Sequence, residues 1–140
     1  MTNSSLRLYQ QGIKVQTTGK SLCQITPQVQ AIVTESGIQA GLCNLFIRHT
    51  SASLLIQEND AKPDVEAFFA KLVPETGQYI LPGEGLDDMP AHIRCALTHT
   101  SEQIPIAQSL LQLGRLQDIF IWEHRQSGHS REVLINILGY

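Results

Sequence analysis

The chain has 140 residues, of which 42% are hydrophobic and 16% charged, and its formal net charge at pH 7 is -3. This composition suits one folded domain with a packed core and excludes the fibrous and disordered classes. The small negative charge gives no bulk electrostatic attraction to nucleic acids or anionic membranes, so neither is expected as a partner.

The sequence predicts a cytoplasmic protein. No apolar run approaches the roughly 20 residues that a membrane-spanning helix needs, and residues 1–12 lack the apolar stretch of a secretory signal. The three cysteines, Cys23, Cys43 and Cys95, form no CxxC pair. Because their number is odd, we expect small hydrophobic side chains in a reducing compartment and no disulfide framework.

Periodic apolar patterns predict one helix and three strands in the first half of the chain. The predicted elements are a strand or hairpin at 6–15, a helix from 26 to 37, and strands at 42–49 and 53–57. Thr26 is the predicted N-cap of the helix, Pro27 its first helical residue, and Gly37 its end.

The second half reads as two helices followed by strands. A helix is predicted at 64–72 with a buried stripe of Val65, Phe68, Phe69 and Leu72. After a loop at 74–86, an Asp of the pair 87–88 is expected to cap a helix that turns Ile93, Ala96 and Leu97 inward. Strands are predicted at 103–107, 116–125 and 131–138, the last one central. This irregular order favours an α+β fold in a single domain spanning 1–140.

His49 stands at the end of an apolar strand and is followed by the hydroxyl residues Thr50 and Ser51. A titratable ring beside hydroxyls at a strand end is a common layout for a functional site. An ordinary turn, whose hydroxyls bond the backbone, is an equally good interpretation.

A second polar cluster surrounds a helix start, where Asp87, Asp88 and His92 occur within six residues. A capping role explains only one of the two acids, and carboxylate with imidazole is a workable metal pair. His92, Cys95 and His99 could also share a helix face, although a plain polar face is the better interpretation of that spacing.

Charged residues also interrupt the apolar strands near the end of the chain. Glu123 and Arg125 lie on one face of a predicted strand, where a charge needs a partner or a cavity. Arg125 and Arg131 flank a turn at Gly128 and could hold a phosphate, or could form a solvated hairpin tip.

Several of these segments together resemble the YjbQ family. They are His-Thr-Ser-Ala-Ser-Leu at 49–54, Glu-Asn at 58–59, Glu-Gly-Leu-Asp-Asp-Met-Pro-Ala-His-Ile at 84–93, Ile-Pro at 104–105 and Glu-His-Arg at 123–125. The resemblance covers nearly the whole chain in order. It implies a compact α+β domain with a mainly antiparallel sheet or sandwich and about three helices, assembled as a homotrimer.

The resemblance also implies a function, for a family long labelled uncharacterised. The expected enzyme is a secondary thiamine-phosphate synthase, a transferase that joins hydroxymethylpyrimidine diphosphate to thiazole phosphate. The alternatives are a metal-dependent hydrolase of a small phosphorylated metabolite and a non-catalytic, trimeric metal- or metabolite-binding protein.

Resemblance and residue patterns together give a set of predicted site residues. The predicted catalytic residues are His49, Asp88, His92 and Glu123. The predicted substrate-binding residues are Thr50, Ser51, Asn59, Arg125 and Arg131. The predicted metal ligands are His49, Asp87, Asp88 and His92. A divalent metal, Zn²⁺ or Mg²⁺, is the expected cofactor, and a small phosphorylated metabolite the expected partner.

Overall fold

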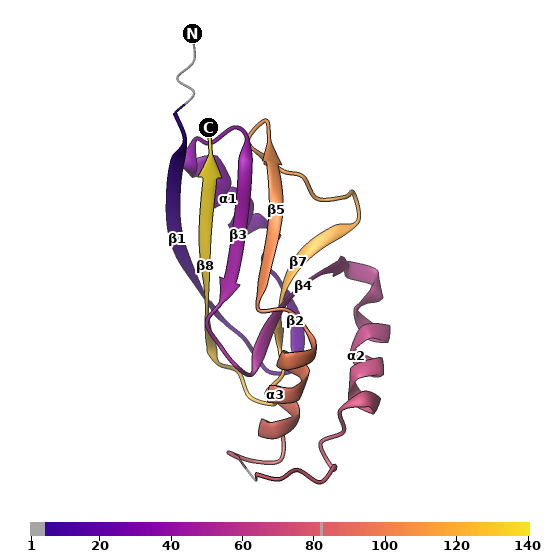
Figure 1. Ribbon diagram of the computed structural model, residues 1–140. Helices are drawn as coiled ribbons and strands as arrows, with labels where there is room; N and C mark the ends of the chain where they lie inside the picture. Colours follow the sequence, from indigo (N-terminus) through magenta and orange to yellow (C-terminus); the bar gives the residue numbers. More distant parts are fainter. Residues whose placement is uncertain (1–4, 82) are drawn as a thin grey trace.

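The computed structural model describes residues 5–81 and 83–140 (Figure 1). The sequence-based expectations for residues 1–4 and for Pro82, in the loop at 74–86, lie outside the described residues. In chain order the elements are β1 (Arg7–Gln16), β2 (Ser21–Gln24), α1 (Thr26–Ser36), β3 (Gly41–Ile47), β4 (Ala52–Glu58), the 3₁₀ helix η1 (Asn59–Ala61), α2 (Lys62–Leu72), α3 (Asp88–Leu97), β5 (Ser101–Ala107), β6 (Leu110–Leu111), β7 (Gln117–Glu123) and β8 (Ser130–Gly139).

The strands of the described residues form two antiparallel sheets. The larger sheet has the order β1-β8-β3-β5-β6, and the smaller one has the order β2-β7-β4. The strand β8 therefore lies inside its sheet, between β1 and β3, as predicted. Together with α1, α2 and α3 the sheets make a single compact α+β domain, which confirms the fold class expected from the sequence (Figure 1).

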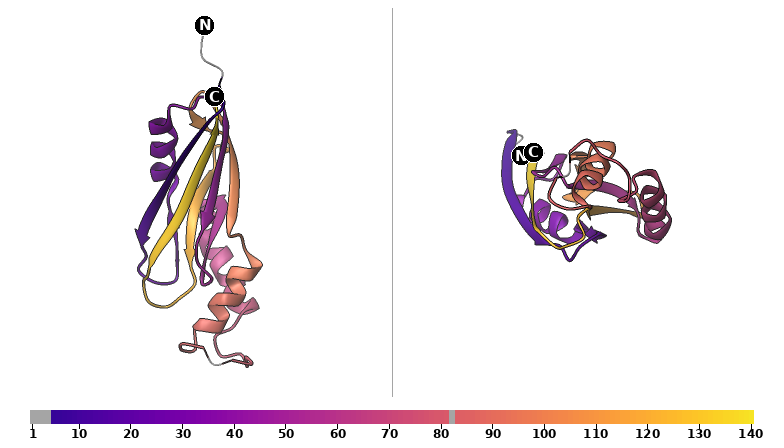
Figure 2. Two further views of the ribbon diagram at one scale, coloured as in Figure 1. Left: turned by 60° about the vertical axis from the view of Figure 1, so that its left-hand side comes forward. Right: turned by 90° about the horizontal axis from the view of Figure 1, so that it is seen from below.

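The main core lies where the two sheets and α1 face one another. On the large sheet, β3 and β8 turn every second residue inward, so that Cys43, Leu45, Val133 and Ile135 are fully buried. Strand alternation explains this pattern, because residues two apart lie on the same face. The left view of Figure 2 shows α1 against one face of the large sheet, with α2 and α3 below the sheet.

The outer face of the large sheet carries apolar side chains. Leu8, Leu138 and Leu42 lie in one row across β1, β8 and β3, and they are 59%, 42% and 40% exposed. Phe46, four residues further along β3 on the same face, is 43% exposed. An apolar sheet face of this kind is more often covered by another surface than left in water.

The predicted N-cap of α1 is wrong, and the predicted N-cap of α3 is right in position only. The hydroxyl of Thr26 accepts a hydrogen bond from the Ile119 amide (2.9 Å) and donates to the Asp118 carboxylate (3.1 Å), so Thr26 ties α1 to β7. Asp87 precedes α3, but its carboxylate makes no capping bond. The predicted end of α1 is confirmed, since Gly37 adopts the left-handed conformation with φ 69°.

The predicted inward faces of α2 and α3 are also partly wrong. Val65 and Phe69 pack half-buried against β7, but Phe68 and Leu72 are exposed. In Figure 1, α2 runs beside the small sheet and α3 lies at the lower end of the molecule. Of the predicted stripe on α2, only Val65 and Phe69 reach the apolar side chains of the small sheet.

On α3 the residues predicted to face inward, Ile93, Ala96 and Leu97, are exposed. Arg94 and Cys95 take the inner face instead, because they reach backbone carbonyls there. Arg94 Nη2 donates to the Val73 oxygen (2.7 Å) and Cys95 Sγ to the Ala52 oxygen (3.2 Å).

Helices of the described residues are too short or too polar to cross a membrane. All three cysteines are free, and Cys43 and Cys95 are buried, which agrees with the expectation of small hydrophobic side chains. Burial raises the pKa of the Cys43 thiol to about 12.

Candidate functional site

A buried ion pair between Glu123 and Arg131 connects the ends of β7 and β8. Arg131 Nε donates to Glu123 Oε1 (2.7 Å), and Arg131 Nη2 bonds the second carboxylate oxygen. The Thr17 hydroxyl also donates to Oε1, at 2.6 Å. Glu123 is fully buried, which alone would raise the pKa of its carboxyl, but the bonds from Arg131 and Thr17 outweigh burial and lower it.

The Arg131 guanidinium also holds the loop that follows β3. Its Nη2 donates to the carbonyl oxygen (3.3 Å) and the hydroxyl (3.1 Å) of Ser51, and its Nη1 lies 3.4 Å from His49 Nδ1. Glu123 therefore acts on the loop through Arg131. Glu123 itself is fully buried.

The His49 ring is constrained from both sides. The Glu132 amide donates to His49 Nε2 at 2.8 Å, so Nε2 carries the lone pair and Nδ1 the proton of the neutral ring. Burial first, and Arg131 second, lower the pKa of His49, which favours this neutral form. Two donors, His49 Nδ1–H and Arg131 Nη1–H, consequently converge without being able to bond each other.

His92, in the second turn of α3, is held in a defined tautomer. Its Nδ1 donates to the Asp88 carbonyl oxygen at 2.7 Å, and one Asp88 carboxylate oxygen lies 3.3 Å from the same nitrogen. Its Nε2 lies 3.2 Å from the exposed Thr50 hydroxyl. The His92 side chain is 37% exposed, so solvent and small molecules can reach it.

Both carboxylates at the start of α3 are engaged by Arg125. Arg125 Nε donates to Asp87 at 2.8 Å, Nη1 lies 3.2 Å from Asp88, and Nη2 donates to the Glu84 carbonyl (3.0 Å). Asp87 also accepts the Gln126 amide at 2.9 Å. Burial would raise the pKa of Asp87, but the bond from Arg125 lowers it overall. Arg125 thus closes the loop before α3 onto the turn after β7, and no open fork of its guanidinium faces solvent.

The four predicted metal ligands do not form a metal centre in residues 5–81 and 83–140. No group of three or more His, Cys, Asp or Glu side chains is placed there to hold an ion. One carboxylate oxygen each of Asp87 and Asp88 already pairs with Arg125, and His49 uses its one lone pair on the Glu132 amide. The expected Zn²⁺ or Mg²⁺ therefore does not fit these residues as they stand.

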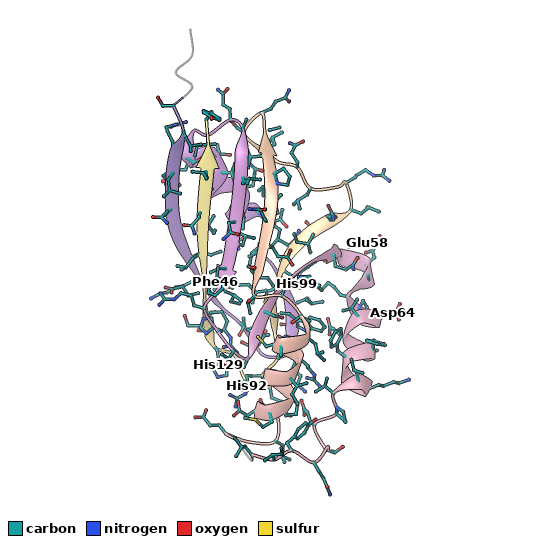
Figure 3. All side chains as sticks on the ribbon, in the orientation of Figure 1. Phe46, Glu58, Asp64, His92, His99 and His129 are labelled. Atoms are coloured by element: carbon teal, nitrogen blue, oxygen red, sulfur yellow. The ribbon has the colours of Figure 1, made fainter. Side chains whose placement is uncertain are left out.

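The structure gathers most of the predicted site residues at one end of the molecule, with one exception. Asn59 begins η1 at the far end of β4, away from the loop at 48–51. In Figure 3 its neighbour Glu58 and His92 lie on different sides of the molecule. The third member of the weak metal hypothesis, His99, bonds Glu102 at 2.5 Å and is exposed.

Four residues that the sequence did not single out lie on or near the two ends of the Glu123–Arg131 ion pair or on the opposite side of β7. They are Thr17, Lys20, Arg94 and His124. Only His124 carried a signal, because it comes directly after a charged residue that ends an apolar strand. Thr17 and Lys20 lie in a polar connection, where nothing distinguishes them from ordinary turn residues.

The same chain matches the family model described as "UPF0047 protein YjbQ-like" over residues 11–140. The chain belongs to the YjbQ family. A UPF0047 protein of Synechocystis sp. is 52% identical over 97% of this chain and 95% of its own length. The YjbQ protein of Escherichia coli O157:H7 is 33% identical over 94% of this chain and 98% of its own length.

Solved structures of the YjbQ family share the fold. A YjbQ/UPF0047 protein of Clostridium acetobutylicum, 29% identical, matches with a TM-score of 0.83 over 90% of this chain and 98% of that chain. A protein of unknown function from Sulfolobus solfataricus, 24% identical, matches with a TM-score of 0.91 over 97% of this chain and 100% of that chain.

These relatives overturn the expected function. The matching family is described without an activity, and the structure from Sulfolobus solfataricus is of unknown function. None of the relatives reported above is described as a thiamine-phosphate synthase. The expectation of that transferase, and of the two alternatives named with it, rested on a resemblance in sequence and is wrong as a conclusion from the family.

Proposed function

We propose that this YjbQ protein is an enzyme in which His92 removes a proton from a hydroxyl group of a small anionic substrate. The hydrogen bonding of His92 carries the proposal. A carbonyl oxygen can only accept, so the 2.7 Å bond to Asp88 puts the proton of the neutral ring on Nδ1. The basic lone pair of Nε2 then faces the Thr50 hydroxyl.

A general base needs a lone pair near the reacting hydroxyl and a neighbour that fixes its orientation. Asp88 is the neighbour that fixes the orientation of His92, because its carbonyl and carboxylate oxygens both lie beside His92 Nδ1. The carboxylate also stabilises the imidazolium that forms when the proton arrives. Thr50 occupies the place that a substrate hydroxyl or a water takes in the reaction.

The donors on the other side of the same loop favour an anionic substrate. His49 Nδ1–H and Arg131 Nη1–H converge at 3.4 Å and both seek an acceptor. A phosphate or carboxylate oxygen accepts from both at once, and charge-assisted bonds from Arg are strong. A small phosphorylated metabolite, which the sequence also suggests as the partner, meets this requirement.

The mechanism assigns no step to a metal ion, because three of the four expected ligands, Asp87, Asp88 and His49, are engaged by Arg125 and Glu132. His92 takes the proton, Asp88 orients and stabilises His92, and His49 with Arg131 binds the anion. Glu123 keeps the Arg131 guanidinium at the loop.

The test is a turnover screen of phosphorylated hydroxy compounds with the full chain in the presence of EDTA. We expect turnover of at least one compound, and a loss of about 10²- to 10⁴-fold in kcat in the His92→Gln variant, as removal of a general base causes. The His49→Gln variant is expected to raise KM more than it lowers kcat.

Thr50→Val is the matched control. It removes the hydroxyl beside His92 Nε2 but leaves the imidazole and the bond to Asp88 in place. Turnover should survive in Thr50→Val, because the substrate brings its own hydroxyl. Activity in His92→Gln equal to wild type, or activity that disappears with EDTA, would contradict the proposal.

A further inference from the structure

A cavity lies on the side of β7 away from Arg131, between that strand and the two helices α2 and α3. Its volume is about 300 Å³. The lining residues are Lys20, Glu66, Ala67, Phe69, Ala70, Arg94, Trp122, Glu123 and His124. Glu123 borders the cavity, but its carboxylate is taken by Arg131 and Thr17.

Strand alternation separates this cavity from the proposed active site. Trp122 and His124 are two residues apart and face α2, with their ring centroids 4.9 Å from each other. Glu123, between them, faces the opposite way toward Arg131. The cavity has no part in the proton transfer proposed for His92.

Aromatic rings form one wall of the cavity. The Phe69 ring meets the Trp122 ring edge-on, with their centroids 4.9 Å apart. Ala67 and Ala70 continue the wall along α2 with small side chains, which leaves room for a flat group beside the rings. Aromatic walls of this kind favour planar ligands with a ring of their own.

Polar atoms at the inner end of the cavity lack partners. Among the described residues, three buried side-chain atoms make no hydrogen bond, namely Glu75 Oε1, Arg94 Nε and His124 Nδ1. Glu75 Oε1 has the Lys20 ammonium beside it as an ion pair. The other two atoms belong to lining residues that are 6% and 1% exposed. A buried donor without an acceptor is costly, so an acceptor is expected in the cavity.

The charges around His124 are mainly positive. Burial first, then Arg94, lowers the pKa of His124 to about 3, and Arg131 and Lys20 act in the same direction. Only Glu123 opposes them there. Burial first, and the Arg94 guanidinium second, lower the pKa of Lys20. Lys20 is therefore close enough to Arg94 for the two positive charges to repel each other. Glu75 pairs with Lys20 and lies 4.0 Å from Arg94 Nη1, but Arg94 Nε is left without an acceptor. Glu66 is on the α2 wall, so the place for a further negative group is beside Arg94 Nε.

His124 can present a donor to such a group. The Thr98 hydroxyl lies 2.7 Å from Ser53 Oγ, and Ser53 Oγ lies 2.9 Å from His124 Nε2. The one proton of the Thr98 hydroxyl can go to the Arg94 carbonyl oxygen, 2.8 Å away, or to Ser53. When Thr98 donates to Ser53, Ser53 gives its own proton to His124 Nε2, and Nδ1 carries the proton of the neutral ring. Arg94 Nε–H and His124 Nδ1–H are then two buried donors that both need an acceptor.

We propose that this cavity binds a small aromatic carboxylate, with the ring against Phe69 and Trp122 and the carboxylate on Arg94 and His124. The site does not depend on the function proposed for His92, since neither group of residues contacts the other's ligand. Binding is noncovalent, and no bond is made or broken.

Benzoate is the probe, and Trp122 is the reporter because it is the one tryptophan of the chain. We expect saturable quenching of Trp122 fluorescence with a Kd below about 1 mM. Benzyl alcohol, which has the ring without the charge, and acetate, which has the charge without the ring, are expected to bind at least about tenfold more weakly. Equal binding of benzyl alcohol, or no saturation with benzoate, overturns the proposal.

Two variants test the placement. Arg94→Met should weaken benzoate binding about tenfold or more, because a charge-assisted bond is lost. Arg94 also bonds Val73, so this variant risks unfolding the loop after α2. Ala70→Phe is the second variant. Ala70 lines the cavity but is exposed on α2, so a phenylalanine there fills the cavity. Lys71→Phe is the matched control, because it introduces the same side chain at the next residue, which does not line the cavity. Loss of binding in Ala70→Phe with full binding in Lys71→Phe supports the site, and equal binding in both overturns it.

Discussion

Acidification is expected to destabilise this fold through His124. The imidazole is 1% exposed, and burial holds its pKa at about 3, whereas 6.5 is the ordinary value for an unfolded chain. Between these two values the unfolded state binds a proton that the folded state does not. The stability is therefore complete above pH 6.5 and falls as the pH is lowered toward 3.

The size of the effect follows from the two pKa values. Each pH unit inside the window removes about 1.4 kcal/mol, so that the loss reaches about 2.7 kcal/mol two units below the unfolded pKa. The charged groups around the ring are Arg94, Glu123, Arg131 and Lys20, and the three cations prevent His124 from becoming charged in the fold.

Urea unfolding, followed by circular dichroism near neutral pH and again two units below the unfolded pKa, measures this loss. His49, Asp87 and Glu123 also have lowered pKa values and add their own acid sensitivity. The His124→Gln variant keeps those groups and can still bond Ser53, so the difference between wild type and variant isolates His124. If both proteins lose stability equally on acidification, His124 is not buried as a neutral ring and the reasoning fails.

Two further changes test the ion pair and the outer sheet face. Glu123→Gln leaves the Arg131 charge buried without its partner, so we expect a loss of about 3–5 kcal/mol in the free energy of unfolding. The double variant Glu123→Leu/Arg131→Met should lose less, because it leaves no unpaired charge in the core. Chemical denaturation measures both, and a single variant as stable as wild type would contradict the pair's role. The predicted homotrimer is expected to use the apolar outer face of the large sheet, so Phe46→Lys should reduce the molar mass of the assembly in light scattering. Gln57→Lys, at an exposed position of β4, is the control and should leave this mass unchanged. An unchanged mass in Phe46→Lys would place the subunit contact elsewhere.

The sequence predicted the sheets well because strand alternation is a local property. The two-residue period alone is enough to assign Cys43 and Leu45, or Val133 and Ile135, to the buried face of the sheet. The small strands β2 and β6 were missed, since four and two residues give too short a pattern. The inner face of α3 was misread because Arg94 is buried only through a carbonyl that lies 21 residues earlier in the chain.

The candidate site was predicted as a set of residues but not as a mechanism. His49, Asp88 and His92 do gather around one loop, as their place at element ends suggested. Their donors and acceptors could not be foreseen, because they are decided by partners from distant segments. The Glu132 amide takes the lone pair of His49, and Arg125 takes the two carboxylates that were expected to bind a metal.

The most direct test of the proposed general base is the tautomer of His92 in solution. A two-bond ¹H–¹⁵N correlation spectrum of the imidazoles, recorded at about pH 8 where histidines are mostly neutral, distinguishes the two ring nitrogens. His92→Gln assigns the signal. We expect a protonated Nδ1 and an unprotonated, basic Nε2 in His92. A proton on Nε2 would leave no lone pair toward Thr50 and would contradict the role of His92 as the base.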